Sequence, residues 1–211
     1  LHTSIIPSKH DALPRLSTPL LISGIHSVIN EPFVRTKCPN ESDIILGVAF
    51  FWGAEHKLWN THGVIVTSGG YAGGYTPNPT YEEVCSGQTG HSEVVQVVFD
   101  TSVISLEGVL NVFWENHDPT QGIRQGNDIG SQYRSVIYTT DDKYMATVEA
   151  SKAAFQKELL GAGHGMITTE IEPLDTYYFA EEYHQQYLLK NPNGYCGLAG
   201  TGVSCPIGLS V

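Results

Sequence analysis

The sequence is short of basic residues and of long apolar runs, and each shortage excludes a class of protein. Eleven lysines and arginines stand against 22 aspartates and glutamates, which gives a formal net charge of −11. This sign repels phosphate backbones and anionic lipid surfaces, so we expect no nucleic acid and no membrane among the partners. No apolar run approaches the ~20 residues that a membrane-spanning helix needs.

The sequence also lacks a recognisable targeting segment and a second set of domain-sized elements. Its first twenty residues have no charged start, apolar centre and small-residue exit, so they do not read as a secretory signal. We therefore expect a cytoplasmic protein, and a monomer. The 211 residues, 41% of them hydrophobic and 16% charged, are enough for one domain with a sizeable core.

Cysteines are few and widely spaced. The four are too far apart for a zinc site and too sparse for a disulfide scaffold. Cys196 and Cys205 lie in a glycine-rich tail that can bring either thiol to a site elsewhere or join the two, unless they are ordinary tail thiols. Glu181 and His184 form a single Glu-x-x-His, whereas a bundle-type dimetal site requires two. We expect no metal and no other cofactor.

Hydrophobic periodicity and glycine turns predict the elements. Strands are expected at 44–51, 64–71, 94–99, 135–139 and 167–171, and helical segments at 52–60, 80–85, 106–116 and 141–160. This order matches the split β-α-β pattern of ferredoxin-like folds. We predict an α+β fold, a two-layer sandwich of a mixed sheet and helices. Within a single domain overall, an extended arm covers 1–42, a catalytic-type domain 43–190 and a coil 191–211.

A strand-to-helix junction at 49–55 is the first candidate site. A residue at a helix start faces free backbone N–H groups and the positive end of the helix dipole, where an anionic nucleophile is stabilised. Here Phe50, Phe51 and Trp52 fill the place. They form either a core-packing triplet or the walls of an aromatic pocket.

Polar groups in two further segments are candidates for acid–base chemistry. Glu93 heads an apolar strand, where partial desolvation raises a carboxyl pKa toward the general-acid range, although many such glutamates are merely strand-edge residues. The loop between the helix at 106–116 and the strand at 135–139 contains Asp128 and Tyr133 among many hydrogen-bonding groups. Such loops are often sites, and equally often self-satisfied turns.

Taken together these segments resemble the methionine sulfoxide reductase A family, over about residues 12–205. The motifs that carry the resemblance are FWG at 51–53, GGYAGG at 69–74, NPTY at 78–81, TGHSE at 89–93, WENHDP at 114–119 and GSQYRS at 130–135. The resemblance implies the α+β fold of that family.

The resemblance also implies a set of roles. In the family a Gly-Cys-Phe-Trp-Gly motif places a reactive cysteine at the helix start, and its thiolate attacks the sulfoxide sulfur. The resulting sulfenic acid is resolved by tail cysteines and finally reduced by thioredoxin. The corresponding residues here are Phe51 and Trp52 as the methyl cradle, Glu93 as the acid, Tyr81 and Tyr133 as oxygen ligands, Asp128 as their assistant, and Cys196 and Cys205 as resolving-type thiols.

The nucleophile itself is missing, because the family's Gly-Cys reads Ala49-Phe50 in this chain. We therefore expect a repurposed, non-redox acid–base enzyme that isomerises, dehydrates or cyclises a small molecule in an aromatic pocket, with Phe50 and His184 among its substrate-binding residues. One alternative is a peptide-methionine (S)-S-oxide reductase that uses a tail cysteine, with thioredoxin as its partner. Another is a non-catalytic pseudoenzyme that binds a methionine-sulfoxide-like ligand or a peptide.

Overall fold

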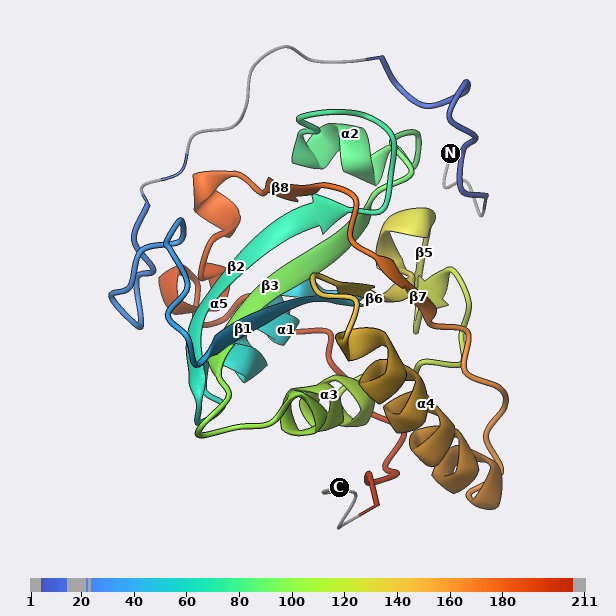
Figure 1. The fold of residues 1–211 in the computed structure, drawn as a ribbon. Coiled ribbons are helices and arrows are strands. Elements are labelled where there is room, and N and C mark those ends of the chain that lie inside the picture. Colours follow the sequence, from blue (N-terminus) through green and yellow to red (C-terminus); the bar gives the residue numbers. More distant parts are fainter. Residues whose placement is uncertain (1–4, 15–21, 23, 207–211) are drawn as a thin grey trace.

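A mixed sheet and a layer of helices make up the molecule (Figure 1). The computed structural model describes residues 5–14, 22 and 24–206. Its helices are α1 (Phe51–Trp59), α2 (Tyr81–Cys85), α3 (Leu106–Glu115), α4 (Tyr144–Gly161) and α5 (Tyr187–Lys190), with 3-10 turns at Ser131–Tyr133 and Glu182–His184. Its strands are β1 (Glu41–Val48), β2 (Val64–Ala72), β3 (Ser92–Asp100), β4 (Arg124–Gln125), β5 (Asp128–Ile129), β6 (Ser135–Thr139), β7 (Glu170–Pro173) and β8 (Tyr177–Phe179).

The large sheet has the strand order β7-β6-β1-β3-β2-β8, and β4 pairs with β5 separately. Every neighbouring pair in the large sheet is antiparallel except β6 with β7. Helix α1 connects β1 to β2 on either side of β3, and α3 lies in the connection from β3 to β6 on either side of β1. The predicted α+β class with a mixed sheet is confirmed.

Alternating side chains of the central strands form two apolar faces. Ile44 and Leu46 of β1 point into the main core, whereas Ile45 between them points to the opposite face. Helices α1, α3 and α4 cover the first face (Figure 1), and the stacked rings of Trp114 and Phe155, 5.7 Å apart, join α3 to α4 within that core. This period of two is what places every second residue of β1 and β3 against the helices.

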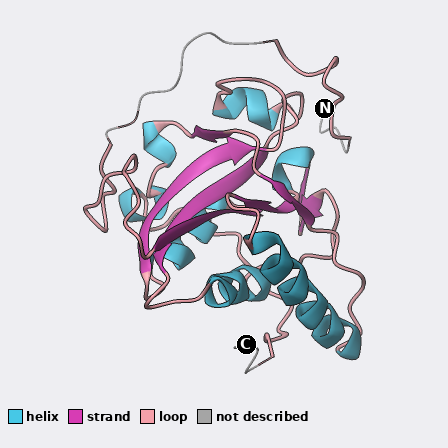
Figure 2. Cartoon of the chain, in the orientation of Figure 1, coloured by secondary structure: helices cyan, strands magenta, loops and turns pink. Residues whose placement is uncertain are grey.

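The opposite face is covered by segments without long helices. Phe33 of the N-terminal arm packs with Val66 and Val98, and Phe179 of β8 joins this cluster. Tyr177 and Leu174 pack over a second small cluster of β-strand residues. Figure 2 shows that the described residues 24–40 and 191–206 run as loops. In the described residues no helix is long and apolar enough to cross a membrane.

Two element boundaries at the first candidate site differ from the prediction. The strand ends three residues earlier than expected, and the helix begins one residue earlier. β1 stops at Val48 because Ala49 has a positive φ of 82°, a left-handed conformation that interrupts the strand. Phe50 is the N-cap, and α1 begins at Phe51. The left-handed position is where the family motif has glycine, so alanine adds backbone strain at this junction.

Candidate active site

The junction between β1 and α1 forms one wall of a cavity of about 90 Å³. The cavity combines aromatic side chains with two carboxyl groups, and its lining residues are Phe50, Phe51, Trp52, Tyr81, Glu93, Asp128, Tyr133 and Tyr195. They come from α1 and its N-cap, α2, β3, β5, the 3-10 turn before β6, and the tail. Seven of the eight were predicted site residues, so segments far apart in the sequence meet here as expected.

Glu93 is the buried acid of the cavity. Its residue is 4% exposed, and the backbone N–H of Phe51 at the start of α1 donates a hydrogen bond to its carboxyl group. Burial raises the pKa of Glu93 to about 8, the Phe51 hydrogen bond opposes this, and the charge of Asp128 adds to it. At neutral pH Glu93 therefore keeps its proton and can act as a general acid.

Two tyrosine hydroxyl groups flank this acid. Burial raises the pKa of Tyr133 to about 12 and the pKa of Tyr81 further still, with the charge of Glu93 as the next cause for both. Both phenols are therefore protonated hydrogen-bond donors near neutral pH. The Tyr81 hydroxyl group also hydrogen-bonds the side chain of Cys85, which brings that thiol to the edge of the site.

The aromatic wall of the cavity is supported by residues that are not part of the cavity lining. The rings of Phe51 and Trp52 are stacked, with centroids 6.2 Å apart and an interplanar angle of 16°. Trp52 donates its indole N–H to Nδ1 of His184 over 2.9 Å, and Tyr187 stacks on its ring at 3.7 Å. His184 is absent from the cavity lining: it lies behind Trp52 and Tyr81, with its ring centroid 4.4 Å from that of Tyr81. The structure thus gives His184 a supporting position where we expected a substrate contact.

Phe50 occupies the place where the family carries its nucleophile. The ring lies 5.9 Å from that of Tyr133 and 5.3 Å from that of Tyr195, both within the cavity lining. Gly197 also packs against this ring, since a Cβ there would meet the Phe50 ring at 2.6 Å. Of the two alternatives for the aromatic triplet, the structure therefore favours the pocket wall.

Tyr195 is the lining residue that the sequence did not reveal. It is 62% exposed and lies in the coil that follows α5, where no periodicity marks it. The sequence signal for it is its position directly before Cys196, one of the two candidate tail thiols.

The four cysteines are all free thiols in different surroundings. Cys38 is exposed in the arm, and Cys196 is exposed beside α1. Burial raises the pKa of Cys85 to about 11, and burial together with the charge of Glu115 raises the pKa of Cys205 to about 12. Within the described part of the chain, no three His, Cys, Asp or Glu side chains come together as metal ligands would.

Comparisons with known proteins point to one family. Residues 42–203 match the family described as peptide methionine sulfoxide reductase. A Pseudomonas syringae protein named peptide methionine sulfoxide reductase MsrA is 56% identical over 206 residues, which cover 98% of this chain and 96% of that protein.

Solved structures give the same result. Methionine sulfoxide reductase A of Corynebacterium diphtheriae is 43% identical and superposes with a TM-score of 0.84, over 95% of this chain and 98% of that one. Mxr1 from Saccharomyces cerevisiae in reduced form is 32% identical, with a TM-score of 0.69 over 87% of this chain and 99% of that one. Another structure of Mxr1 is a complex with Trx2, at 23% identity and a TM-score of 0.50 over 74% of this chain and 90% of that one.

Proposed function

The chain belongs to the peptide methionine sulfoxide reductase family, and we propose that it reduces methionine sulfoxide with the thiol of Cys196 in its tail. This thiol takes the place of the cysteine that the family motif carries where this chain has Phe50. The substrate class is a peptide or small molecule that contains methionine sulfoxide. The expectations of a monomer and of a cytoplasmic location stay predictions.

The expectation of a repurposed, non-redox isomerase or cyclase is wrong, and so is that of a pseudoenzyme. Relatives that are 52–56% identical over nearly the whole chain are named as reductases. The error has a physical origin. A buried acid flanked by two phenols suits an isomerase, but it is equally what a sulfoxide oxygen needs as it gains protons, so the presence of Glu93, Tyr81 and Tyr133 did not discriminate between the two.

The observation that carries the proposal is the contact between the tail and the start of α1. A Cβ on Gly53 would lie 2.9 Å from the Cys196 sulfur, so this thiol rests against the first turn of α1. Its two chain neighbours, Tyr195 and Gly197, both pack on Phe50. Cys196 is thereby held within one residue of the cavity lining, beside the first turn of the nine-residue helix α1.

The other three thiols are less suited to the attack. The thiolate is the nucleophile, and the raised pKa values of Cys85 and Cys205 keep both of these thiols protonated at neutral pH. Cys205 is also buried, with its backbone N–H bonded to Oε1 of Glu115 over 2.8 Å. Cys38 is exposed in the arm, four residues before the predicted end of that segment, and has no contact with the cavity lining among the described contacts.

The proposed reaction is a two-electron oxygen transfer. The Cys196 thiolate attacks the sulfoxide sulfur, while Glu93 gives its proton to the oxygen and Tyr81 and Tyr133 donate hydrogen bonds to it. The oxygen then passes from the methionine sulfur to the cysteine sulfur, as the methionine S–O bond and the newly formed S–S bond both break. The products are the methionine thioether, which is reduced, and a Cys196 sulfenic acid, which is oxidised. The apolar faces of Phe51 and Trp52 receive the substrate methyl group.

The catalytic cycle closes with two further thiols. The Cys205 thiol attacks the sulfenic sulfur, which forms a Cys196–Cys205 disulfide and releases the oxygen as water. We propose thioredoxin as the dithiol that reduces this disulfide, in keeping with the complex that Mxr1 forms with Trx2. Cys205 must leave its contact with Glu115 to take part, and the glycine-rich tail allows that movement.

The test is reduction of the S epimer of methionine sulfoxide, with dithiothreitol and separately with thioredoxin as reductant. We expect Cys196→Ser to slow the reaction at least about a hundredfold with either reductant, because it removes the nucleophile. Cys205→Ser should keep the first turnover and lose the thioredoxin-dependent cycle. Cys38→Ser, an exposed thiol away from the cavity, is the matched control and should react at the parent rate.

Two results would overturn the proposal in different ways. An inactive parent protein, under conditions in which a Phe50→Cys variant is active, would mean that the chain has lost reduction. Full activity in Cys196→Ser would mean that another thiol attacks the sulfoxide.

A further inference from the structure

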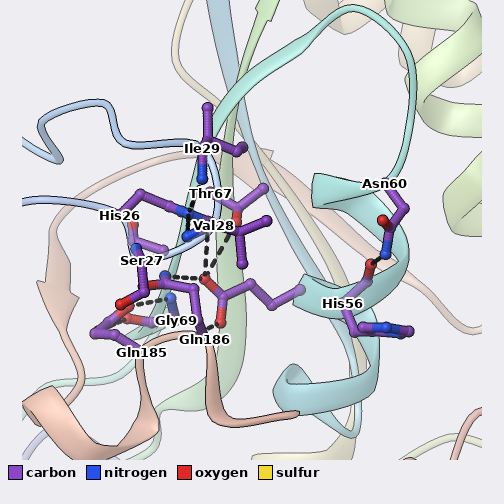
Figure 3. A network of polar contacts seen from close by, with 12 residues as sticks. His26, Ser27, Val28, Ile29, His56, Asn60, Thr67, Gly69, Gln185 and Gln186 are labelled. Atoms are coloured by element: carbon purple, nitrogen blue, oxygen red, sulfur yellow. Dashed lines mark hydrogen bonds and ion pairs between the residues drawn. The ribbon is translucent and has the colours of Figure 1, made fainter. Parts of the chain in front are cut away.

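Glu55, in the middle of α1, is a buried carboxyl group with an unusually complete set of hydrogen bonds. Its residue is 1% exposed. It accepts hydrogen bonds from the Gln186 backbone N–H over 2.9 Å, from the Gln186 side-chain amide over 2.7 Å and from the Thr67 hydroxyl group over 3.1 Å. Figure 3 shows how Thr67 of β2, Gln186 after the 3-10 turn at Glu182–His184 and His26 of the arm come together in this network. A buried carboxylate persists only with such donors.

The N-terminal arm completes the network. Nδ1 of His26 accepts the backbone N–H groups of Val28 and Ile29, each over 3.1 Å, so the ring proton lies on Nε2. That Nε2 atom bonds the Thr67 hydroxyl group over 2.8 Å, and burial lowers the pKa of His26 to about 4, which keeps the ring neutral. His26 therefore donates to the Thr67 hydroxyl group, which in turn donates to Glu55.

Gln186 has an unfavourable backbone conformation that its contacts stabilise. Its φ of 49° and ψ of 44° are left-handed, a backbone conformation that is strained for a residue with a side chain. Besides its two bonds to Glu55, its side-chain oxygen accepts the backbone N–H of Ser27 over 3.0 Å. The preceding residue, Gln185, bonds both the N–H and the carbonyl group of Gly69, each over 2.9 Å. The turn is thus fastened to α1, to β2 and to the arm.

The same turn holds the indole of the cavity wall. His184 accepts the Trp52 indole N–H, and Tyr187 stacks on the Trp52 ring with an interplanar angle of 11°. Glu55 lies three residues after Trp52, on the same helix. The Glu55 carboxyl group therefore joins two segments. One is helix α1, which contains Trp52, and the other is the turn whose residues His184 and Tyr187 contact the Trp52 ring.

We propose that Glu55 is a positioning residue for the cavity: by holding Gln186 it fixes His184 and Tyr187 against Trp52 and so sets the wall that receives the substrate methyl group. Glu55 touches no substrate. Its effect on catalysis rests on the proposed reductase function, whereas its effect on Trp52 does not.

The experiment compares Glu55→Gln with Gln186→Gly. Glu55→Gln keeps the shape but replaces one carboxyl oxygen by an amide N–H₂ donor, so at least one Gln186 donor loses its acceptor. Gln186→Gly keeps the left-handed turn and removes only the side chain, so it tests the same link if Glu55→Gln folds poorly. Glu149→Gln, on the exposed side of α4, is the matched control. The first readout is the indole N–H resonance of Trp52, assigned with Trp52→Phe.

We expect this resonance to shift and broaden in both variants and to stay in place in the control. With methionine sulfoxide as substrate, both variants should raise KM about tenfold while kcat changes by less than about threefold, because a binding wall has moved and the reacting groups have not. An unchanged Trp52 resonance in both variants would overturn the proposal. If the parent protein reduces no sulfoxide, the resonance still decides the role of Glu55, so the two proposals fail separately.

Discussion

At the scale of single residues, Glu93 shows how burial prepares a side chain for chemistry. Its carboxyl pKa rises from an ordinary value to about 8, mainly because burial disfavours the charge. The protonated form is the one that can give a proton to the sulfoxide oxygen. As the pH rises through about 8 this proton is lost, so the rate of reduction should fall there.

We predict that Glu93→Gln lowers kcat by about a hundredfold, the usual contribution of a general acid, and removes the falling limb near pH 8. Relative to the parent, the same variant should gain stability as the pH rises from about 4.5 to about 8, because over this range the Glu93 carboxyl ionises in the unfolded chain but stays protonated in the folded protein. Rate profiles and thermal unfolding across pH 5–9 measure both effects. An unaltered falling limb in the variant would assign that limb to another group.

Sequence reasoning identified most residues of the cavity and missed those that act through contacts. The resemblance supplied Phe51, Trp52 and Tyr81 from motifs, because those side chains stand at recognisable positions. It gave no hint of Glu55 or Gln186, whose importance comes only from their meeting in the folded chain. Gln186 follows no helical or strand pattern, and no sequence signal predicts its left-handed backbone conformation.

At the scale of elements, the first turn of α1 and the tail form one unit. Gly53 leaves room for the tail, since a Cβ there would collide with the Cys196 carbonyl oxygen and approach its sulfur to 2.9 Å. Within a helix alanine is favoured over glycine by up to about 1 kcal/mol, so Gly53→Ala should not destabilise α1 itself.

We predict that Gly53→Ala keeps the fold, displaces the tail and slows sulfoxide reduction by about tenfold or more, because the nucleophile leaves its position. Gly161→Ala, at the end of α4 where a Cβ meets nothing within 4 Å, is the control and should be as active as the parent. Circular dichroism tests whether each variant keeps the fold, and the reductase assay measures its rate. Parent-like activity in Gly53→Ala would show that the docked tail is not needed for the attack.

The element boundaries show where local patterns end and tertiary contacts begin. β3, α3 and β6 fall close to their predicted ranges, because alternation and helical periodicity mark them clearly. The last predicted strand, at 167–171, lies instead at Glu170–Pro173, where it pairs in parallel with β6. β8, three residues long, was not predicted, because it is defined only by its pairing with β2.

At the scale of the whole molecule, the α+β class was predictable, whereas the cover of the second sheet face was not. The arm reads as irregular in sequence, yet Phe33 and His26 are buried in the folded protein. Their burial depends on the sheet that the rest of the chain forms, and no local pattern encodes it. The division of the chain at residues 42 and 190 stays a prediction.

The tail places two thiols in different surroundings, with Cys196 against α1 and Cys205 buried near Glu115. The most direct measurement is therefore a single turnover without reductant. The fully reduced protein is treated with the S epimer of methionine sulfoxide, the methionine released is counted, and the oxidised cysteines are located by peptide mass. We predict one methionine per protein and a Cys196–Cys205 disulfide. No methionine, or oxidation confined to Cys38 or Cys85, would contradict a nucleophile in the tail.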